Sequence, residues 1–143
     1  MVGRRIVTAS EIGLAGATLA AVADVLWPTG AGGVAAGADL ICFFVSLPVW
    51  VVSFGLALSR STRGDDIAVA SWVFLAGGAA PTPVRRRLLG VFAGSVVLAA
   101  ATAWANPFVV LVPMLPLGFA ALWGARYGTF PQQSGVRVGG SPR

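Results

Sequence analysis

Four long runs of apolar residues divide this sequence, and polar and charged residues gather between them. The runs cover residues 6–27, 34–59, 88–105 and 107–123. A helix needs about 20 predominantly apolar residues, in a range of about 17 to 25, to cross a bilayer. The first two runs reach this length easily, and the last two lie at its lower end. The pattern therefore predicts an all-α integral membrane protein, built as a bundle of four transmembrane helices.

Two of the connections between these runs are short. Residues 28–33 join the first run to the second, and Asn106 and Pro107 join the third to the fourth. Short connections favour antiparallel helical hairpins. We therefore expect the bundle to consist of two antiparallel hairpins, joined by the longer segment 60–87.

That longer segment contains an apolar stretch that is too short to span a membrane as a helix. Asp65 and Asp66 precede it and suit the N-cap and first turn of a helix, while Gly77 and Gly78 follow it and favour termination. Residues 67–76 therefore predict a short helix that does not span. Its sequence has no polar face, so we expect it to pack against the other helices or dip into the membrane.

From Gly128 the sequence becomes polar and rich in Gly and Pro. Such composition is typical of a terminal segment without a packed core. The chain length suits one domain. We therefore expect a transmembrane domain over residues 1–127 and a flexible cytoplasmic tail over residues 128–143.

The positive charges are distributed unevenly. The chain has ten arginines, no lysine and a net charge of +5. With four spans, every arginine falls on the same side of the membrane: Arg4, Arg5, Arg60, Arg63, Arg85, Arg86, Arg87, Arg126, Arg137 and Arg143. The positive-inside rule assigns this side to the cytoplasm. Both termini are therefore predicted to be cytoplasmic, and the abundance of Ala, Val and Gly without Lys favours the inner membrane of a GC-rich bacterium.

Composition restricts the classes of function. The chain is 57% hydrophobic and 10% charged, whereas soluble domains carry about 25% charged residues. The arginines lie between apolar runs, so topology explains them better than a nucleic-acid partner does. The sequence has no histidine and a single cysteine, Cys42, which excludes an intrachain disulfide, a histidine-bound metal and the usual nucleophile–histidine pairs within this chain. We expect no enzymatic activity and no cofactor.

A competing interpretation treats the first apolar run as a signal peptide. Arg4 and Arg5 would form its basic start, and the small residues around Val22 resemble a cleavage site. Glu11 interrupts the beginning of the apolar region, and the four-span arrangement accounts for the arginines better. The first run is therefore expected to remain as a span.

Three carboxylates lie in or near the membrane: Glu11, Asp24 and Asp39. A charge inside a bilayer is costly, so each is a candidate functional group. All three lie near the predicted ends of their spans, Asp24 and Asp39 on the outer side and Glu11 on the inner side. The simpler expectation is that they reach lipid headgroups or cap helices.

Asp39 is the strongest candidate because it begins a polar stripe. Asp39, Ser46 and Ser53 recur every seven residues, and Cys42 lies one turn from Asp39. Such a stripe can line a hydrated crevice or form a hydrogen-bonded seam between helices. We favour the seam.

Small residues predict where helices approach one another closely. Gly90 and Gly94 form a GxxxG pattern in the third run, and Gly13 and Ala17 belong to a ridge of small residues in the first. These positions suit packing inside the chain, and they equally suit self-association.

Three prolines, Pro48, Pro113 and Pro116, fall inside predicted spans. Proline removes a backbone donor and bends a helix. Bends can serve as hinges in transporters, but neighbouring helices can also hold them as fixed bends. We expect fixed bends.

A basic cluster is expected beside the membrane on the cytoplasmic side, formed by Arg60, Arg63, Arg85, Arg86 and Arg87. Arginine near an anionic leaflet attracts lipid headgroups, by about 1 kcal/mol per residue. Anionic lipid headgroups are therefore predicted partners.

Four short spans with a carboxylate in the first, here Glu11, resemble the small multidrug-resistance transporters. The resemblance is limited to helix count and this residue, and the charge bias and the long segment 60–87 depart from it. We instead expect a non-catalytic accessory or structural subunit of a membrane assembly, or a bundle that associates with itself. The alternative is a small proton- or ion-coupled transporter or channel that uses an intramembrane carboxylate.

Overall fold

The computed structural model describes residues 3–27 and 32–132, and this part of the chain is helical without a β-strand. The all-α prediction is thereby confirmed. The elements, in chain order, are α1 (Arg4–Leu26), α2 (Gly32–Ser61), α3 (Val69–Val73), α4 (Thr82–Thr102), the 3₁₀ helix η1 (Pro107–Leu111) and α5 (Met114–Tyr127).

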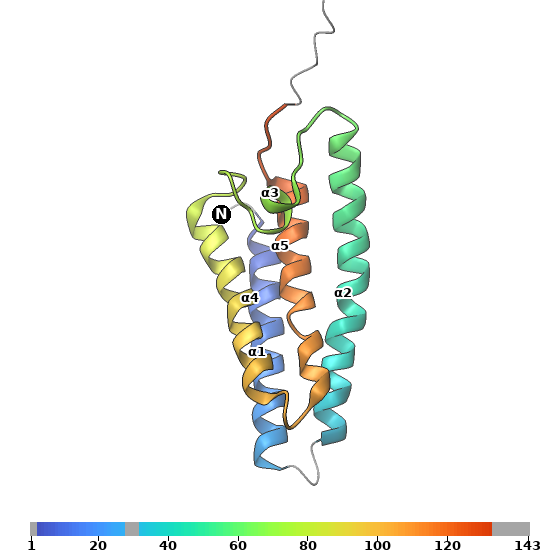
Figure 1. Ribbon diagram of the computed structural model, residues 1–143, viewed down its shortest axis with the longest axis vertical. Coiled ribbons are helices and arrows are strands. Elements are labelled where there is room, and N and C mark those ends of the chain that lie inside the picture. The colour runs from blue at the N-terminus through green and yellow to red at the C-terminus, as the bar shows by residue number, and fades with distance from the viewer. Residues whose placement is uncertain (1–2, 28–31, 133–143) are drawn as a thin grey trace, which may run out of the picture.

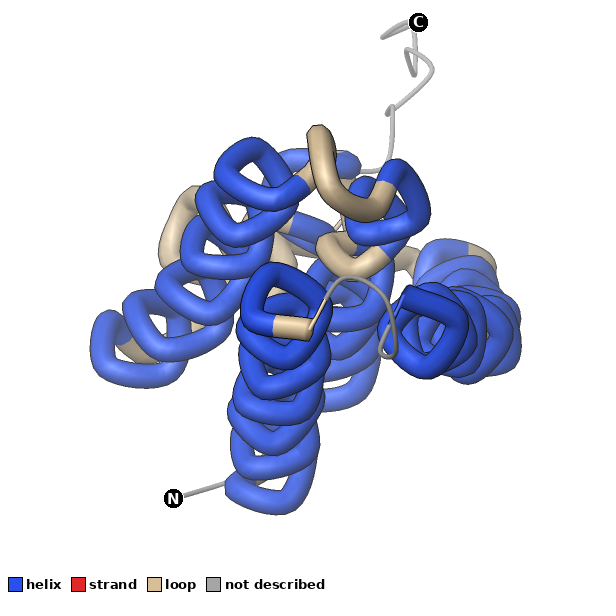
Figure 2. Tube along the Cα trace, turned by 90° about the horizontal axis from the view of Figure 1, so that it is seen from below, coloured by secondary structure: helices blue, strands red, loops and turns tan. Residues whose placement is uncertain are grey.

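The long helices lie side by side, with α5 at the centre (Figure 1). α5 packs against α1, α2, α3 and α4, whereas α2 meets chiefly α5 and, to a smaller extent, α1 and η1. α1 and α4 begin at the end of the molecule where α2 and α5 finish (Figure 1). Figure 2 shows the same helices from below, and Figure 1 shows the short α3 and its loops at the end where α2 and α5 finish. Residues 28–31 of the predicted first connection lie outside the described residues.

Three helical segments are long and apolar enough to cross a membrane: Arg4–Leu26, Gly33–Ser61 and Pro107–Tyr127. This finding supports a multi-pass membrane protein. α4 is not among them because Arg85, Arg86 and Arg87 occupy its first two turns, so that its uncharged part begins only at Leu88.

α2 differs from a helix in a water-soluble protein in which side chains it buries and which it exposes. Its buried side chains are small or polar: Ala35, Asp39, Ser46, Ser53 and Ala57. Its exposed side chains include large apolar ones: Ile41, Phe44, Val51, Val52, Phe54 and Leu58. A helix facing water would bury the large apolar residues instead. The arrangement fits lipid, where small residues allow close helix contact and apolar residues face the acyl chains.

Three of the four predicted packing positions face a neighbouring helix. A Cβ atom on Gly13 would lie 3.2 Å from Leu115 of α5, and one on Gly94 would lie 3.3 Å from Leu14 of α1. Ala17 is buried in a cluster that α1, α4 and η1 share. Gly90 differs, because a Cβ there would meet nothing within 4 Å.

The short helix between α2 and α4 exists but is shorter than the predicted 67–76. α3 begins after Ala68, which offers no side-chain cap, whereas the carboxylate of Asp65 is engaged by Arg60. It ends before Leu75, a fully buried residue with a left-handed φ of 53°. The expected capping by Asp65 and termination at Gly77 are therefore wrong, since other contacts hold the aspartate and the turn occurs two residues earlier.

The predicted fourth span is divided into two pieces rather than bent. Pro107 begins the 3₁₀ helix η1, and the side chain of Asn106 accepts a hydrogen bond from Phe108 N at its start. Pro113 then precedes α5, and Pro116 lies in the first turn of α5. Prolines at these positions cost few helical hydrogen bonds, because the first N–H groups of a helix lack partners anyway. Pro48 lies inside α2.

The first residues of the predicted tail are bound to the connections before and after α3. Thr129 N donates to Ala79 O at 3.0 Å, and Asp66 N donates to Pro131 O at 2.8 Å. Phe130 packs against a core cluster that contains Trp72. The predicted boundary before Gly128 therefore falls inside a packed segment, and residues 133–143 lie outside the described part of the chain.

Candidate functional site

One polar pair joins α2 to the turn before η1. Asn106 Nδ2 donates to Asp39 Oδ2 at 2.8 Å, and both side chains are buried. Because Asn106 Oδ1 accepts from Phe108 N at 3.0 Å, the amide must direct its NH₂ group at the carboxylate. The backbone thus fixes the orientation of Asn106, and Asn106 satisfies one oxygen of the buried acid.

Asp24 approaches the same region from α1. Its side chain is buried near the end of α1, at the end of the molecule where α2 begins (Figure 1). Asp39 is the eighth residue of α2, about 10 Å from the beginning of the helix at 1.5 Å per residue. The two carboxylates thus lie toward one end of the helices, on the side opposite to the arginines.

The remaining members of the α2 stripe have separate partners. Ser46 Oγ donates to Phe43 O of its own helix at 2.6 Å. Ser53 Oγ accepts from Trp72 Nε1 at 3.2 Å, and the same N–H lies 2.9 Å from Ala121 O of α5. Cys42 is a half-buried free thiol. The polar stripe of α2 is thus not a continuous chain of contacts. Asp39 and Ser53 each have a partner from another part of the chain, and Ser46 between them bonds to the backbone of its own helix.

Glu11 lies apart from the other two acids. It is exposed on α1, and its Oε1 is 3.9 Å from Arg87 Nη1 of α4. An exposed ion pair at this distance contributes about 0–1 kcal/mol. Glu11 therefore lies on the surface at the end of the molecule where α1 and α4 begin and α2 and α5 finish (Figure 1). We call this the arginine end.

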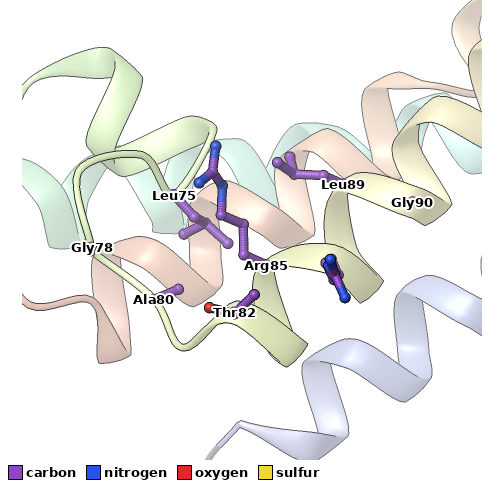
Figure 3. A pocket seen from close by; sticks show the side chains of 8 residues that line it. Leu75, Gly78, Ala80, Thr82, Arg85, Leu89 and Gly90 are labelled. Carbon is purple, nitrogen blue, oxygen red and sulfur yellow. The ribbon is translucent and has the colours of Figure 1, made fainter.

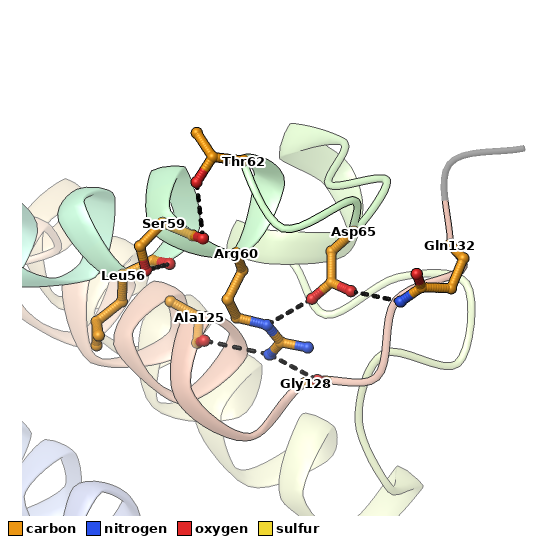
Figure 4. Close-up of polar contacts among 8 residues, drawn as sticks. All are labelled: Leu56, Ser59, Arg60, Thr62, Asp65, Ala125, Gly128 and Gln132. Atoms are coloured by element: carbon orange, nitrogen blue, oxygen red, sulfur yellow. Dashed lines mark hydrogen bonds and ion pairs between the residues drawn. The ribbon is translucent and has the colours of Figure 1, made fainter. Parts of the chain in front are cut away.

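Arg60 forms a clamp at the arginine end (Figure 4). Its Nε donates to Asp65 Oδ2 at 2.7 Å, while Nη1 donates to the carbonyl oxygens of Ala125 at 3.2 Å and Gly128 at 2.9 Å. The guanidinium carbon also lies 4.8 Å from the centre of the Phe130 ring. The clamp ties the end of α2 to the end of α5, where a cation also suits the helix carbonyls.

The clamp continues through the tail. Asp65 Oδ1 accepts from Gln132 Nε2 at 3.0 Å, and residues 65 and 132 form an isolated antiparallel β-bridge. Nε and Nη1 of Arg60 donate to groups inside the chain. The predicted contact of Arg60 with a lipid headgroup would therefore have to be made by Nη2. Arg63, Arg85 and Arg86 are exposed.

A groove separates the loop after α3 from the first turns of α4 (Figure 3). We call it the α3–α4 groove. It has a volume of about 530 Å³ and is lined by Leu75, Gly78, Ala80, Thr82, Arg85, Arg86, Leu89 and Gly90. Two residues of the predicted headgroup cluster, Arg85 and Arg86, therefore share a cavity with Gly90, which was predicted to serve in helix packing.

Sequence reasoning missed Asn106 and Trp72. The signal for Asn106 was present, because Asn directly before Pro is a favoured start of a helical turn and its side chain caps that turn. Trp72 carried no comparable signal, since its partners Ser53 and Ala121 come from distant parts of the chain.

Within residues 3–27 and 32–132, no three Cys, Asp or Glu side chains gather closely enough to hold a metal ion. The polar pairs described above join helices or helix ends, which is a positioning role. No protein-family model, no curated protein and no solved structure matches this chain.

Proposed function

We propose that this chain is a small non-catalytic protein of the bacterial inner membrane that serves as an accessory or structural subunit of a membrane assembly, or associates with itself. The observation that carries the proposal is the fixed pairing of its buried polar groups. Asp39 pairs with Asn106, and Ser53 pairs with Trp72. Polar groups held in this way stabilise contacts between helices.

In the proposed topology α4 is a fourth span, giving a four-helix bundle of two antiparallel hairpins. Two observations support it: α4 packs along α1 and α5, and its arginines lie at the end where α1 begins and where α2 and α5 finish. Arginine at a helix end can extend its charged group to the interface while its stem stays in lipid. The positive-inside rule then places both termini in the cytoplasm.

The alternative is a small proton- or ion-coupled transporter. It is favoured by two buried carboxylates at the same end of the helices, Asp24 and Asp39, because such acids often mark ion pathways. Substrate and ion sites of transporters, however, typically lie near the bilayer midplane. These carboxylates lie toward one end, and Asn106 holds Asp39 in a contact between helices.

The two functions are separated by Asp39→Asn. The amide keeps the shape of the side chain and can still pair with Asn106, but it cannot change its charge state. In a deletion strain complemented with this variant, a structural subunit keeps its membrane abundance and its cellular role. Asp66→Asn, at an exposed position in the connection, is the matched control. Normal abundance together with complete loss of complementation would reject the structural role and favour transport.

Native association provides the second measurement. Full-length protein extracted from its own membranes in mild detergent should migrate as a complex larger than the single chain, with a partner or further copies in constant stoichiometry. Migration as the single chain, at native expression levels and in several detergents, would contradict the subunit role.

A further inference from the structure

We propose that the α3–α4 groove binds one anionic phospholipid, with its phosphate between Arg85, Arg86 and Thr82 and the upper part of an acyl chain against Leu89, in the space beside Gly90. The inference deepens the predicted headgroup contact, and its location in the cytoplasmic leaflet rests on the proposed topology. The predicted headgroup contact is thereby narrowed from the whole cluster of arginines to one site with named residues.

The polar half of the groove is positively charged and uncompensated. Arg85 and Arg86 are exposed, and neither forms an ion pair with another described residue, whereas Arg60 and Arg87 each have a carboxylate within 4.0 Å. Arginine donors are well suited to phosphate oxygens, which they can bind in a bidentate manner. The Arg85 side chain extends over the groove between Leu75 and Leu89 (Figure 3).

The beginning of α4 adds to this attraction. α4 has 21 residues and starts after Pro81 without a side-chain cap. Pro83 has no N–H, and Val84 N and Arg85 N both donate to Pro81 O, so Thr82 N is the N–H group that this end can offer. A helix N-terminus carries a partial positive charge and attracts phosphate. The hydroxyl of Thr82, at the first position of the helix, lines the same groove.

The other half of the groove is apolar and open. Leu89 is half-buried and offers apolar surface, while Leu75 beneath it is fully buried, and Gly90 leaves room because a Cβ atom there would meet nothing within 4 Å. A volume of about 530 Å³ falls in the usual range for small-molecule sites, about 300–1,000 Å³. A soluble anion would use only the arginines and the hydroxyl, whereas a phospholipid also covers Leu89.

The wall of the groove contains unusual backbone. Leu75, Gly77 and Gly78 all have left-handed φ values, of 53°, 63° and 81°. For a buried leucine this conformation is unfavourable, and such strain is typical of ligand sites held by their surroundings. It gives the loop the sharp reversal that leaves the groove between α3 and α4.

The site can be tested by native mass spectrometry of the full-length chain in a neutral detergent, titrated with phosphatidylglycerol or with zwitterionic phosphatidylcholine. The wild-type chain should bind one phosphatidylglycerol preferentially. The double substitution R85Q/R86Q should weaken this binding about thirtyfold, from two arginines that each contribute about 1 kcal/mol. R63Q/R126Q is the matched control, because it removes the same charge at the same end from exposed positions outside the groove.

A second pair of variants tests the apolar half. Gly90→Leu should fill the groove and displace the lipid while both arginines remain. Gly16→Leu is its control, since Gly16 is also exposed and helical with open space around it. Helix content and thermal unfolding of every variant are measured in parallel. If R85Q/R86Q fails to fold, the site is judged by Gly90→Leu, and if Gly90→Leu fails to fold, it is judged by R85Q/R86Q.

Equal weakening by R85Q/R86Q and R63Q/R126Q, or equal binding of the two lipids, would overturn the site in favour of general surface attraction. Displacement of the lipid by excess inorganic phosphate would overturn the lipid as occupant and indicate a soluble anion. Unchanged binding in Gly90→Leu would overturn the acyl-chain half. Micelles have no sidedness, so these results are independent of the membrane topology, which the labelling experiment below tests separately.

Discussion

Asn106 and Asp39 lie 67 residues apart in the sequence, yet the amide of one donates to the carboxylate of the other at 2.8 Å between buried side chains. Asn106 is held in turn by Phe108 N, so the acid is paired with a group whose orientation is already fixed. The contact joins α2 to the connection between α4 and η1.

Asn106→Ala should lower the free energy of unfolding by about 1–3 kcal/mol, because it leaves a buried carboxylate without its donor. The measurement is reversible unfolding of the purified chain in mixed micelles. Thr18→Ala is the control, since the Thr18 hydroxyl is exposed and bonds only to Leu14 O of its own helix. An equal loss in the two variants would contradict the importance of the pair.

The charge of Asp39 can be separated from its shape in the same assay. In the Asn106→Ala background, Asp39→Asn removes the unpaired charge and should recover part of the lost stability at neutral pH. If the double variant is less stable than Asn106→Ala alone, the carboxylate must have a further stabilising partner.

Arg60→Lys should loosen the end of the tail while the charge remains. Lysine offers a single point charge and cannot reproduce the three bonds to Asp65, Ala125 and Gly128. We expect hydrogen exchange to accelerate at Thr129 and Gln132, where the backbone and the side chain are bound to the connections before and after α3. Arg63→Lys, at an exposed position, should leave exchange unchanged, and similar exchange in both variants would show that the clamp does not hold the tail.

Two buried serines should respond oppositely to the same substitution. Ser10 Oγ has no hydrogen-bond partner among the described residues, so Ser10→Ala should leave stability unchanged or raise it by up to about 1 kcal/mol. Ser53 accepts from Trp72, so Ser53→Ala should destabilise by about 1 kcal/mol. Thermal unfolding monitored by near-UV circular dichroism compares them, and a larger loss in Ser10→Ala would reverse the assignment.

The proposed topology can be checked with single cysteines in a Cys42→Ala background. Labels at Thr62 and Thr82 should react from the cytoplasmic side, because α3 between them does not cross. A label at Ala105, after α4, should react from the outside. Labelling of Thr82 and Ala105 from the same side would show that α4 does not span. This is the most critical part of the topology, because three arginines lie in the first two turns of α4.

The sequence predicted the helices well because apolar runs of membrane length have few other interpretations. It failed where a tertiary contact decided the local structure. Asp65 looked like a helix cap, but Arg60 binds its carboxylate, and α3 starts after Ala68 instead. Glycines mark common helix ends, so Gly77 seemed the natural stop, whereas buried packing of Leu75 places the turn at a residue that rarely adopts it.

For the candidate sites, periodicity identified one partner of each polar pair but never the other. The seven-residue spacing brought Asp39 and Ser53 onto one face of α2, which the structure buries. Asn106 and Trp72, their partners, belong to a turn and a five-residue helix that have no periodicity to read. The α3–α4 groove was hidden for a related reason: GxxxG suggested a helix contact, but at Gly90 the neighbouring element is a loop that stays away from it.

The unequal lengths of the helices have a consequence for the surrounding bilayer. α2 has 30 residues and is about 45 Å long, whereas the uncharged part of α4, residues 88–102, measures only about 22 Å. A hydrocarbon layer of about 30 Å matches neither. In the proposed topology α2 is accommodated by tilting, and α4 by thinner lipid together with arginine side chains that extend to the interface. Hydrophobic mismatch thus differs between the two sides of one small protein, which would bias it toward places where the membrane is already thin or curved.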